Sequence, residues 1–278
     1  MNDATLRAVY GLKYNPFLPT LPSQALWCLP GVNAFAQRLE TLTTHGGFAL
    51  ITGEPGQGKS KTLHWLCDKL RQVPDLTIGV MERPQSSMVD FYRELGELFG
   101  VPMNLANRYG GFKSLRARWQ AHCDSTLHRA VLLIDEAQEV SSQCLTELRL
   151  LQSSRFDSES LLFTVLCGDT RLSDRFRLPE LLPLGSRIRA RLPLGPLPPD
   201  TLKEYLDFAL TQAGHPQLMT PELMQTLAAH AAGNLRVVNH MAAELLTTAA
   251  QRNLPRLDES LYLELFTPTQ QARRAEKR

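Results

Sequence analysis

Eight consecutive residues, 53–60, constrain this chain more than any other stretch, because they read GxxxxGKS. An apolar run at 48–51 precedes them, and a run with helical character at 62–70 follows them. A strand, a glycine-rich loop and a helix in this order are typical of a phosphate-binding loop. The glycines let backbone N–H groups turn inward, and the helix N-terminus adds positive potential. The predicted phosphate-binding residues are Gly53, Glu54, Pro55, Gly56, Gln57, Gly58, Lys59, Ser60 and Lys61.

Two side chains at the end of this loop have specific predicted tasks. Lys59 has the length and the charge to reach the β- and γ-phosphates of a nucleotide. The Ser60 hydroxyl follows it directly and is predicted to ligate a magnesium ion. The loop therefore predicts ATP and Mg²⁺ as the cofactors of the chain.

A second segment supplies the acidic groups that nucleotide hydrolysis requires. Residues 130–134 are an apolar run with branched side chains, which predicts a buried parallel strand, and Asp135 and Glu136 follow it. Ligands of open α/β sheets bind at the carboxyl ends of strands, so we expect Asp135 to hold Mg²⁺ beside Ser60. Glu136 is the predicted polariser of the attacking water, and Gln138 is a candidate for orienting the site. The alternative is an ordinary strand end with two exposed acids, which the phosphate-binding loop in the same chain disfavours.

Composition limits the classes of protein that this chain can belong to. It has 278 residues, 43% of them hydrophobic, and a formal net charge of +2, so it can bury a full core and carries no global basic field. The five cysteines are scattered without a CxxC pair, which predicts reduced thiols and neither a disulfide frame nor a zinc site. The sequence shows no signal peptide and no apolar run long enough to span a bilayer. We therefore expect a soluble, cytoplasmic protein with no membrane partner.

Apolar runs and helical patterns alternate up to residue 194, which predicts an α/β fold with a parallel, doubly wound sheet. A proline-rich stretch at 193–199 marks a change, and only helical patterns follow it. The predicted parts are an irregular, proline-rich segment at 1–30, the α/β nucleotide-binding domain at 31–195, a small all-helical domain at 196–266 and a basic tail at 267–278.

The phosphate-binding loop, the acidic pair and the C-terminal helical domain together resemble the AAA+ ATPases, a class of P-loop NTPases. The helical domain then corresponds to the lid of that fold. Residues 233–236 resemble the sensor 2 motif, which implies that Arg236 reaches the γ-phosphate of its own subunit. Residues 184–191 resemble the region of the arginine finger, which acts in a neighbouring subunit's ATP site. The resemblance assigns this role first to Arg187, with Arg189 and Arg191 as alternatives.

One position departs from the pattern of the family. Sensor 1 should be a polar residue at the end of the strand that follows Asp135, and the segment 164–169 fits that place. Asp169 stands there, where related sequences carry Gln or Asn. A carboxylate near the γ-phosphate would repel it, so either another group serves as sensor 1 or hydrolysis is slow.

The resemblance is closer to the ExeA-like branch of AAA+ proteins and covers residues 8–266. Residues 10–12 and 15–17 look like the N-terminal signature of that branch, which implies that Asn15 and Phe17 lie near the adenine. The stretches 52–56 and 133–138 fit the same branch.

Two kinds of function occur in this branch. The first is that of DNA-transposition ATPases of the TnsC, MuB, TniB or IstB type, which assemble on duplex DNA as a hexameric ring or a helical filament. They recruit or activate a transposase, and ATP hydrolysis drives their disassembly. The second is an ExeA- or GspA-like secretion-assembly ATPase, with other AAA+ protein-remodelling ATPases beside it. The length of the chain and the lack of a membrane span favour the transposition reading.

Contact with duplex DNA would fall mainly on its phosphates, because ring-forming ATPases follow backbone shape more than sequence. The predicted DNA-binding residues are Arg108, Lys113 and Arg116, which lie close together in a polar segment next to Tyr109. A solvated helix face is the alternative for each of them. Arg116 and Arg118 cannot share a face of one helix, so only part of this set can act together.

Overall fold

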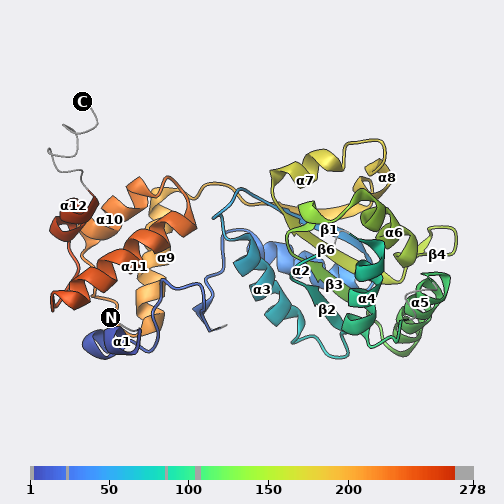
Figure 1. Cartoon of the computed structure of the whole chain (residues 1–278), viewed down its shortest axis with the longest axis horizontal. Helices are drawn as coiled ribbons and strands as arrows, with labels where there is room; N and C mark the ends of the chain where they lie inside the picture. Colours follow the sequence, from blue (N-terminus) through green and yellow to red (C-terminus); the bar gives the residue numbers. More distant parts are fainter. Residues whose placement is uncertain (1–2, 23–24, 85–86, 104–107, 267–278) are drawn as a thin grey trace. The chain divides into compact units, whose positions relative to one another are not determined.

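The computed structural model describes residues 3–22, 25–84, 87–103 and 108–266. The chain forms two compact units (Figure 1). One comprises residues 28–194, and the other combines the chain before residue 28 with the chain from residue 195 onward.

A five-stranded sheet forms the centre of the unit 28–194, and its strands lie in the order β2-β3-β6-β1-β7. Every neighbouring pair in this sheet is parallel, which confirms the predicted α/β class. The three middle strands are buried along their whole length, as expected for a sheet covered on both faces. The strands are β1 (Gly47–Thr52), β2 (Ile78–Met81), β3 (Ala130–Ile134), β6 (Leu162–Gly168) and β7 (Ile188–Pro193).

Helices alternate with these strands along the chain and surround the sheet (Figure 1). They are α2 (Val32–Thr43), α3 (Lys59–Leu70), α4 (Met88–Phe99), α5 (Arg108–Ser125), α6 (Ser142–Gln152), α7 (Thr170–Arg175) and α8 (Leu182–Gly185). A 3-10 turn, η2 (Ala137–Glu139), follows β3, and a short antiparallel hairpin of β4 (Ser153–Ser154) and β5 (Glu159–Ser160) precedes β6. Large apolar side chains fill the space between sheet and helices: Trp119 is fully buried and meets Phe99 edge to face at 5.3 Å between ring centroids.

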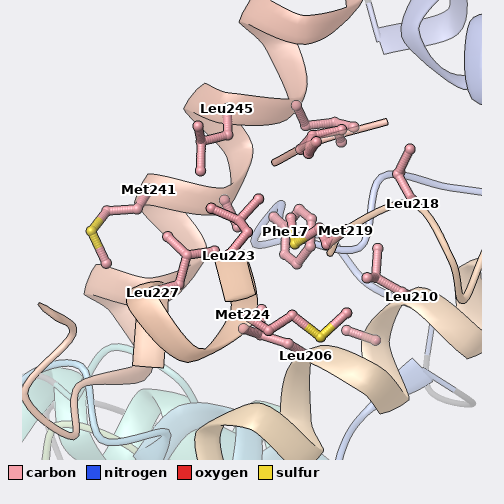
Figure 2. Packing of buried hydrophobic residues seen from close by; sticks show 14 of the residues in the cluster. Phe17, Leu206, Leu210, Leu218, Met219, Leu223, Met224, Leu227, Met241 and Leu245 are labelled. Carbon is pink, nitrogen blue, oxygen red and sulfur yellow. The ribbon is translucent and has the colours of Figure 1, made fainter. Parts of the chain in front are cut away.

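The helices of the second unit, in the residues that the structure describes, are α9 (Pro199–Ala213), α10 (Pro221–His230), α11 (Leu235–Gln251), α12 (Glu259–Phe266) and the N-terminal α1 (Asp3–Tyr10). Figure 2 shows its core, where Phe17 lies among Leu206, Leu223, Met224 and neighbouring apolar side chains. The irregular conformation expected for residues 1–30 is wrong for α1. The prolines begin only at position 16, and before them Leu6 and Tyr10 lie one helical turn apart and are buried against this core.

Buried tyrosines give the helical unit a sensitivity to alkali. Burial raises the pKa of Tyr10, Tyr14 and Tyr262, and it raises the pKa of Tyr205 to about 12, although a hydrogen bond to Asn239 lowers it. An unfolded tyrosine ionises near pH 10. The folded state therefore binds the phenolic protons more tightly than the unfolded state, and this stabilisation is complete below about pH 10.

We predict that the free energy of unfolding falls as the pH rises from about 10 to about 12, with Tyr205 alone contributing roughly 2–3 kcal/mol. Denaturant unfolding followed by circular dichroism across that range measures it. Tyr205→Phe should flatten part of this dependence. At neutral pH it should cost about 1 kcal/mol, because the 2.6 Å hydrogen bond to Asn239 is lost. An unchanged alkaline slope in Tyr205→Phe would refute the assignment.

Candidate nucleotide site

The phosphate-binding loop joins the end of β1 to the start of α3, as predicted. Gly56 and Gly58 both have a φ of 87°, a conformation that side-chain-bearing residues rarely adopt, so these two glycines allow the loop to wrap. Gln57 is buried and braces the loop from inside: its Oε1 accepts a hydrogen bond of 2.7 Å from the Glu54 N–H. Lys59 is also buried, and its Nζ donates to the Glu54 carbonyl at 3.2 Å.

Gly53 is required for a different reason, which is space. A Cβ at this position would lie 2.8 Å from the Leu194 carbonyl oxygen and 2.8 Å from Gln57 Oε1.

The first turn of α3 presents Ser60 on the exposed surface, while Lys61 is half-buried and burial lowers its pKa. The loop therefore offers backbone donors, one ammonium group and one hydroxyl at the start of a helix, which suits a phosphate chain.

The acidic pair lies at the same edge of the sheet as the loop. Strand β6 separates β3 from β1, and its residues Leu166 and Cys167 pair with Ile134 and Ile51, close to the carboxyl ends of all three strands. Burial raises the pKa of the Cys167 thiol well above its usual range, and the nearby carboxylates of Asp135 and Glu136 raise it further, while Lys59 lowers it. The pairing of β6 with both β3 and β1 thus places the two halves of the predicted site at the same edge of the sheet.

Glu136 occupies a strained and exposed position directly after the half-buried Asp135. Its φ of 48° is uncommon for a residue with a side chain, and such outliers gather at functional sites. Asp135 Oδ1 accepts the Glu136 N–H at 2.9 Å, and Gln138 Nε2 donates to Glu136 Oε2. The pair therefore has distinct surroundings: Asp135 also meets the Cys167 thiol, whereas Glu136 faces solvent beside an amide.

Asp169 does not stand as the isolated charge that the sequence suggested. Its carboxylate begins α7 by accepting the Arg171 N–H at 3.0 Å, and it also pairs with Arg171 Nε at 2.6 Å. The Asp169 N–H donates to Gln138 Oε1 at 3.2 Å. Neutralisation by Arg171 weakens the expected repulsion of a γ-phosphate, because the negative charge already has a partner.

Sequence reasoning missed Thr170, which lies next to Asp169 at the start of α7. Its hydroxyl donates to Glu54 Oε1 at 2.7 Å and so ties α7 to the phosphate-binding loop. The one signal in the sequence was the place of Thr170 just after the predicted strand that became β6, at the edge of the sheet where the loop also lies.

Ser60 and Asp135 supply oxygen ligands of the kind that Mg²⁺ takes together with phosphate oxygens and water. The residues present therefore fit this ion with ATP, and Lys59 adds the positive charge that the phosphates require.

Of the candidate arginines near β7, Arg187 lies at the opposite, amino edge of the sheet, whereas Arg191 pairs with Leu50 in the carboxyl half of β1. Arg187 comes immediately before this strand, and its guanidinium pairs with Asp157 of the β4–β5 hairpin and donates to the Pro183 carbonyl. Arg189 and Arg191 are exposed on the strand itself, with Arg191 Nη2 3.4 Å from the Gly185 carbonyl.

Three predicted site residues belong to the helical unit. Phe17 is buried in its core (Figure 2), and Asn15 Oδ1 accepts the Phe17 N–H at 3.1 Å, so both shape the N-terminal turn. Arg236 is exposed in the first turn of α11, where its N–H is capped by Asn234 at 2.9 Å. The roles of these residues towards a nucleotide stay predictions.

The predicted DNA contacts have partners within the fold. Arg108 forms an ion pair with the buried carboxylate of Glu147. Arg116 donates to the carbonyls of Leu151 and Ser153 and thus caps the end of α6, and burial lowers its pKa. Lys113 is exposed, with its Nζ 4.6 Å from the centre of the Tyr109 ring. Two of the three residues therefore already stabilise α5 and α6.

None of the helices in the described part of the chain is both long enough and apolar enough to cross a membrane.

Comparisons with known proteins agree with this fold. A family model described as an AAA domain matches residues 42–176. The general secretion pathway protein A of Aeromonas hydrophila is 34% identical over 212 residues, which is 74% of this chain. The match spans only 38% of the length of that relative.

Solved structures show the same fold at low sequence identity. The Cdc6p protein of Pyrobaculum aerophilum aligns with a TM-score of 0.66 and 15% identity, over 87% of this chain and 67% of its own. Domain III of the Thermotoga maritima replication initiation protein DnaA aligns with a TM-score of 0.59 and 17% identity, over 90% of this chain and 98% of its own. The fold is therefore that of an AAA+ P-loop NTPase. The AAA domain match agrees with the predicted resemblance to AAA+ proteins, and the closer resemblance to the ExeA-like branch stays a prediction.

We predict that Glu136→Gln lowers kcat for ATP hydrolysis by about 10²–10⁴-fold, because Glu136 is the predicted polariser of the attacking water. The affinity for a fluorescent ATP analogue should change little, since Lys59 and the loop remain. Full hydrolysis by this variant would exclude Glu136 from that role.

Gly53→Ala should lower the free energy of unfolding by about 1–3 kcal/mol and weaken nucleotide binding, because its Cβ would displace Gln57 or the Leu194 carbonyl. The control is Gly195→Ala, where a Cβ would meet nothing within 4 Å. Denaturant unfolding and nucleotide titration of both variants test this, and equal behaviour of the two would contradict it.

Proposed function

We propose that this chain is an ATPase that binds MgATP at the phosphate-binding loop and hydrolyses it with the acidic pair after β3. The observation that carries the proposal is the shared carboxyl edge of the sheet, where the loop with Lys59 follows β1 and Asp135 and Glu136 follow β3, with β6 paired to both strands. The AAA domain match over residues 42–176 supports it, because that range contains all three residues.

Each group has a task that follows from its chemistry. Backbone N–H groups of the loop and the Lys59 ammonium hold the phosphates, and Ser60 and Asp135 hold the metal ion, whose charge stabilises the transferring phosphoryl group. Glu136 is exposed and held by Gln138, so its carboxylate is available to orient a water molecule.

The sheet also supports an assembly of several subunits. Strand β7 spans six residues, which is about 20 Å, and Arg187 stands at its amino end while the loop lies at the carboxyl edge. Arg187 is therefore remote from the ATP site of its own unit. A role for this side chain in hydrolysis requires a neighbouring copy, which favours a homo-oligomeric ring or filament with Arg187, Arg189 or Arg191 acting across the interface.

For the cellular role we favour a secretion-assembly ATPase that acts on a protein partner. The relative that aligns with 74% of this chain at 34% identity is named a general secretion pathway protein. The transposition role, with duplex DNA and a transposase as partners, ranks second, since Arg108 and Arg116 have structural partners in the fold. This reverses the order that the sequence alone suggested.

Two measurements decide between these roles. Fluorescence anisotropy with duplex DNA is recorded with ATPγS, with ADP and without nucleotide, across a salt series, beside an ATPase assay. We expect ATP hydrolysis and no nucleotide-dependent DNA binding. Salt-sensitive DNA binding that appears only with ATPγS would instead establish the transposition role. Absence of hydrolysis at every protein concentration would contradict the ATPase itself.

We predict that specific ATPase activity rises with protein concentration and that Arg187→Ala lowers it by about 10³-fold while nucleotide affinity is kept. Arg177→Ala is the matched control, because Arg177 is an exposed arginine that pairs with Asp174, three residues before it. Parallel variants of Arg189 and Arg191 identify the acting residue. If none of the three substitutions affects hydrolysis, a finger from this segment is excluded.

A further inference from the structure

The side-chain amide of Gln138 lies between the ends of two strands that carry the site. Its Nε2 donates to Glu136 Oε2, after β3, and its Oε1 accepts the Asp169 N–H at 3.2 Å, after β6. Chemistry fixes the direction of this amide. A carboxylate can only accept and a backbone N–H can only donate, so the opposite orientation would leave both partners unsatisfied.

The surroundings hold Gln138 in this place. Arg175 donates to the Gln138 carbonyl at 2.6 Å and to the Val140 carbonyl at 2.9 Å, which anchors the η2 turn to α7. Ala137, next to Gln138, is fully buried. The Gln138 amide fits only because residue 168 is a glycine: a Cβ there would lie 2.5 Å from Gln138 Oε1.

The contacts continue from Gln138 to the phosphate-binding loop. Asp169 is followed by Thr170, whose hydroxyl donates to Glu54 Oε1 at 2.7 Å. Glu54 in turn contacts the Lys59 ammonium through its carbonyl. A path of polar contacts and one peptide link therefore leads from the loop that holds the phosphates to the Glu136 carboxylate.

We propose that Gln138 is the positioning residue of Glu136, and that it couples this carboxylate to the phosphate-binding loop through Asp169 and Thr170. The inference rests on the proposed role of Glu136 in hydrolysis. Glu136 is exposed, and the hydrogen bond from the Gln138 amide holds its carboxylate in one direction. A displacement of about 1 Å at such a group costs on the order of 10²-fold in rate.

The first test compares Gln138→Ala and Gln138→Glu with the control Gln143→Ala, which changes an exposed glutamine in the first turn of α6. Gln138→Glu keeps the size of the side chain and replaces the donor with a carboxylate beside Glu136. We expect both Gln138 variants to lower kcat about 100-fold and to change KM and the affinity for a fluorescent ATP analogue less than about threefold. Unchanged kcat, or a loss of nucleotide affinity as large as the loss of kcat, would overturn the proposal.

The second test needs no hydrolysis. The measurement is an NMR spectrum of nucleotide-free ¹⁵N-labelled protein, which shows the side-chain NH₂ signals of Gln138. These signals are identified by their absence from the Gln138→Ala spectrum or, if that variant does not fold, by assignment of the wild-type spectrum. We expect Glu136→Gln to shift them, and Thr170→Val, which removes the hydroxyl that contacts Glu54, to shift them as well. Signals that stay in place in both variants would overturn the proposal. Full hydrolysis by Glu136→Gln would instead refute the proposed function of Glu136, so the two failures are distinguishable.

Discussion

The parallel pairing of β3, β6 and β1 is the constraint on which the site depends. Because the strands run in one direction, their carboxyl ends meet at a single edge, and the segments that follow them are forced together. The phosphate-binding loop follows β1, the acidic pair follows β3, and Asp169 follows β6. A register slip of one residue in β6 would turn Cys167 away from Asp135 and move the Asp169 N–H away from Gln138.

Side-chain hydrogen bonds give this edge a defined shape. Gln57 holds the loop from inside, Gln138 links two strand ends, and Arg175 ties the η2 turn to α7. The Gln138 amide uses one donor and one acceptor, and the Arg175 guanidinium uses several donors, so each of these two side chains joins two segments. Hydrogen bonds of one side chain also join segments away from the site. The Glu147 carboxylate of α6 accepts hydrogen bonds from Tyr92 of α4 and from Arg108 of α5, and so holds the three helices together.

Much of the fold was predictable from the sequence, since it depends on local patterns. Glycine and hydroxyl spacing identified the loop, and the apolar run before Asp135 identified its strand. The predicted α/β fold of the P-loop NTPase class is confirmed by the sheet. The partners of long side chains were not predictable: Arg116 looked like a surface cation, but it caps the end of α6, where its acceptor carbonyls lie 34–37 residues further along the chain. Arg171 follows Asp169 by two residues, but the ion pair between them forms because the chain turns into α7 at this point.

The distance between Arg187 and the phosphate-binding loop has a further consequence for symmetry. On the proposed roles, each subunit carries a donor surface at one edge of its sheet and an acceptor surface at the other, and the two face in opposite directions. A two-fold symmetric dimer joins identical surfaces, so it cannot bring a donor surface against an acceptor surface. Head-to-tail contact is heterologous, so every added subunit leaves one donor and one acceptor open until the assembly closes or continues as a helix. An assembly built in this way has a polarity, and its two ends present different chemistry to whatever partner binds them.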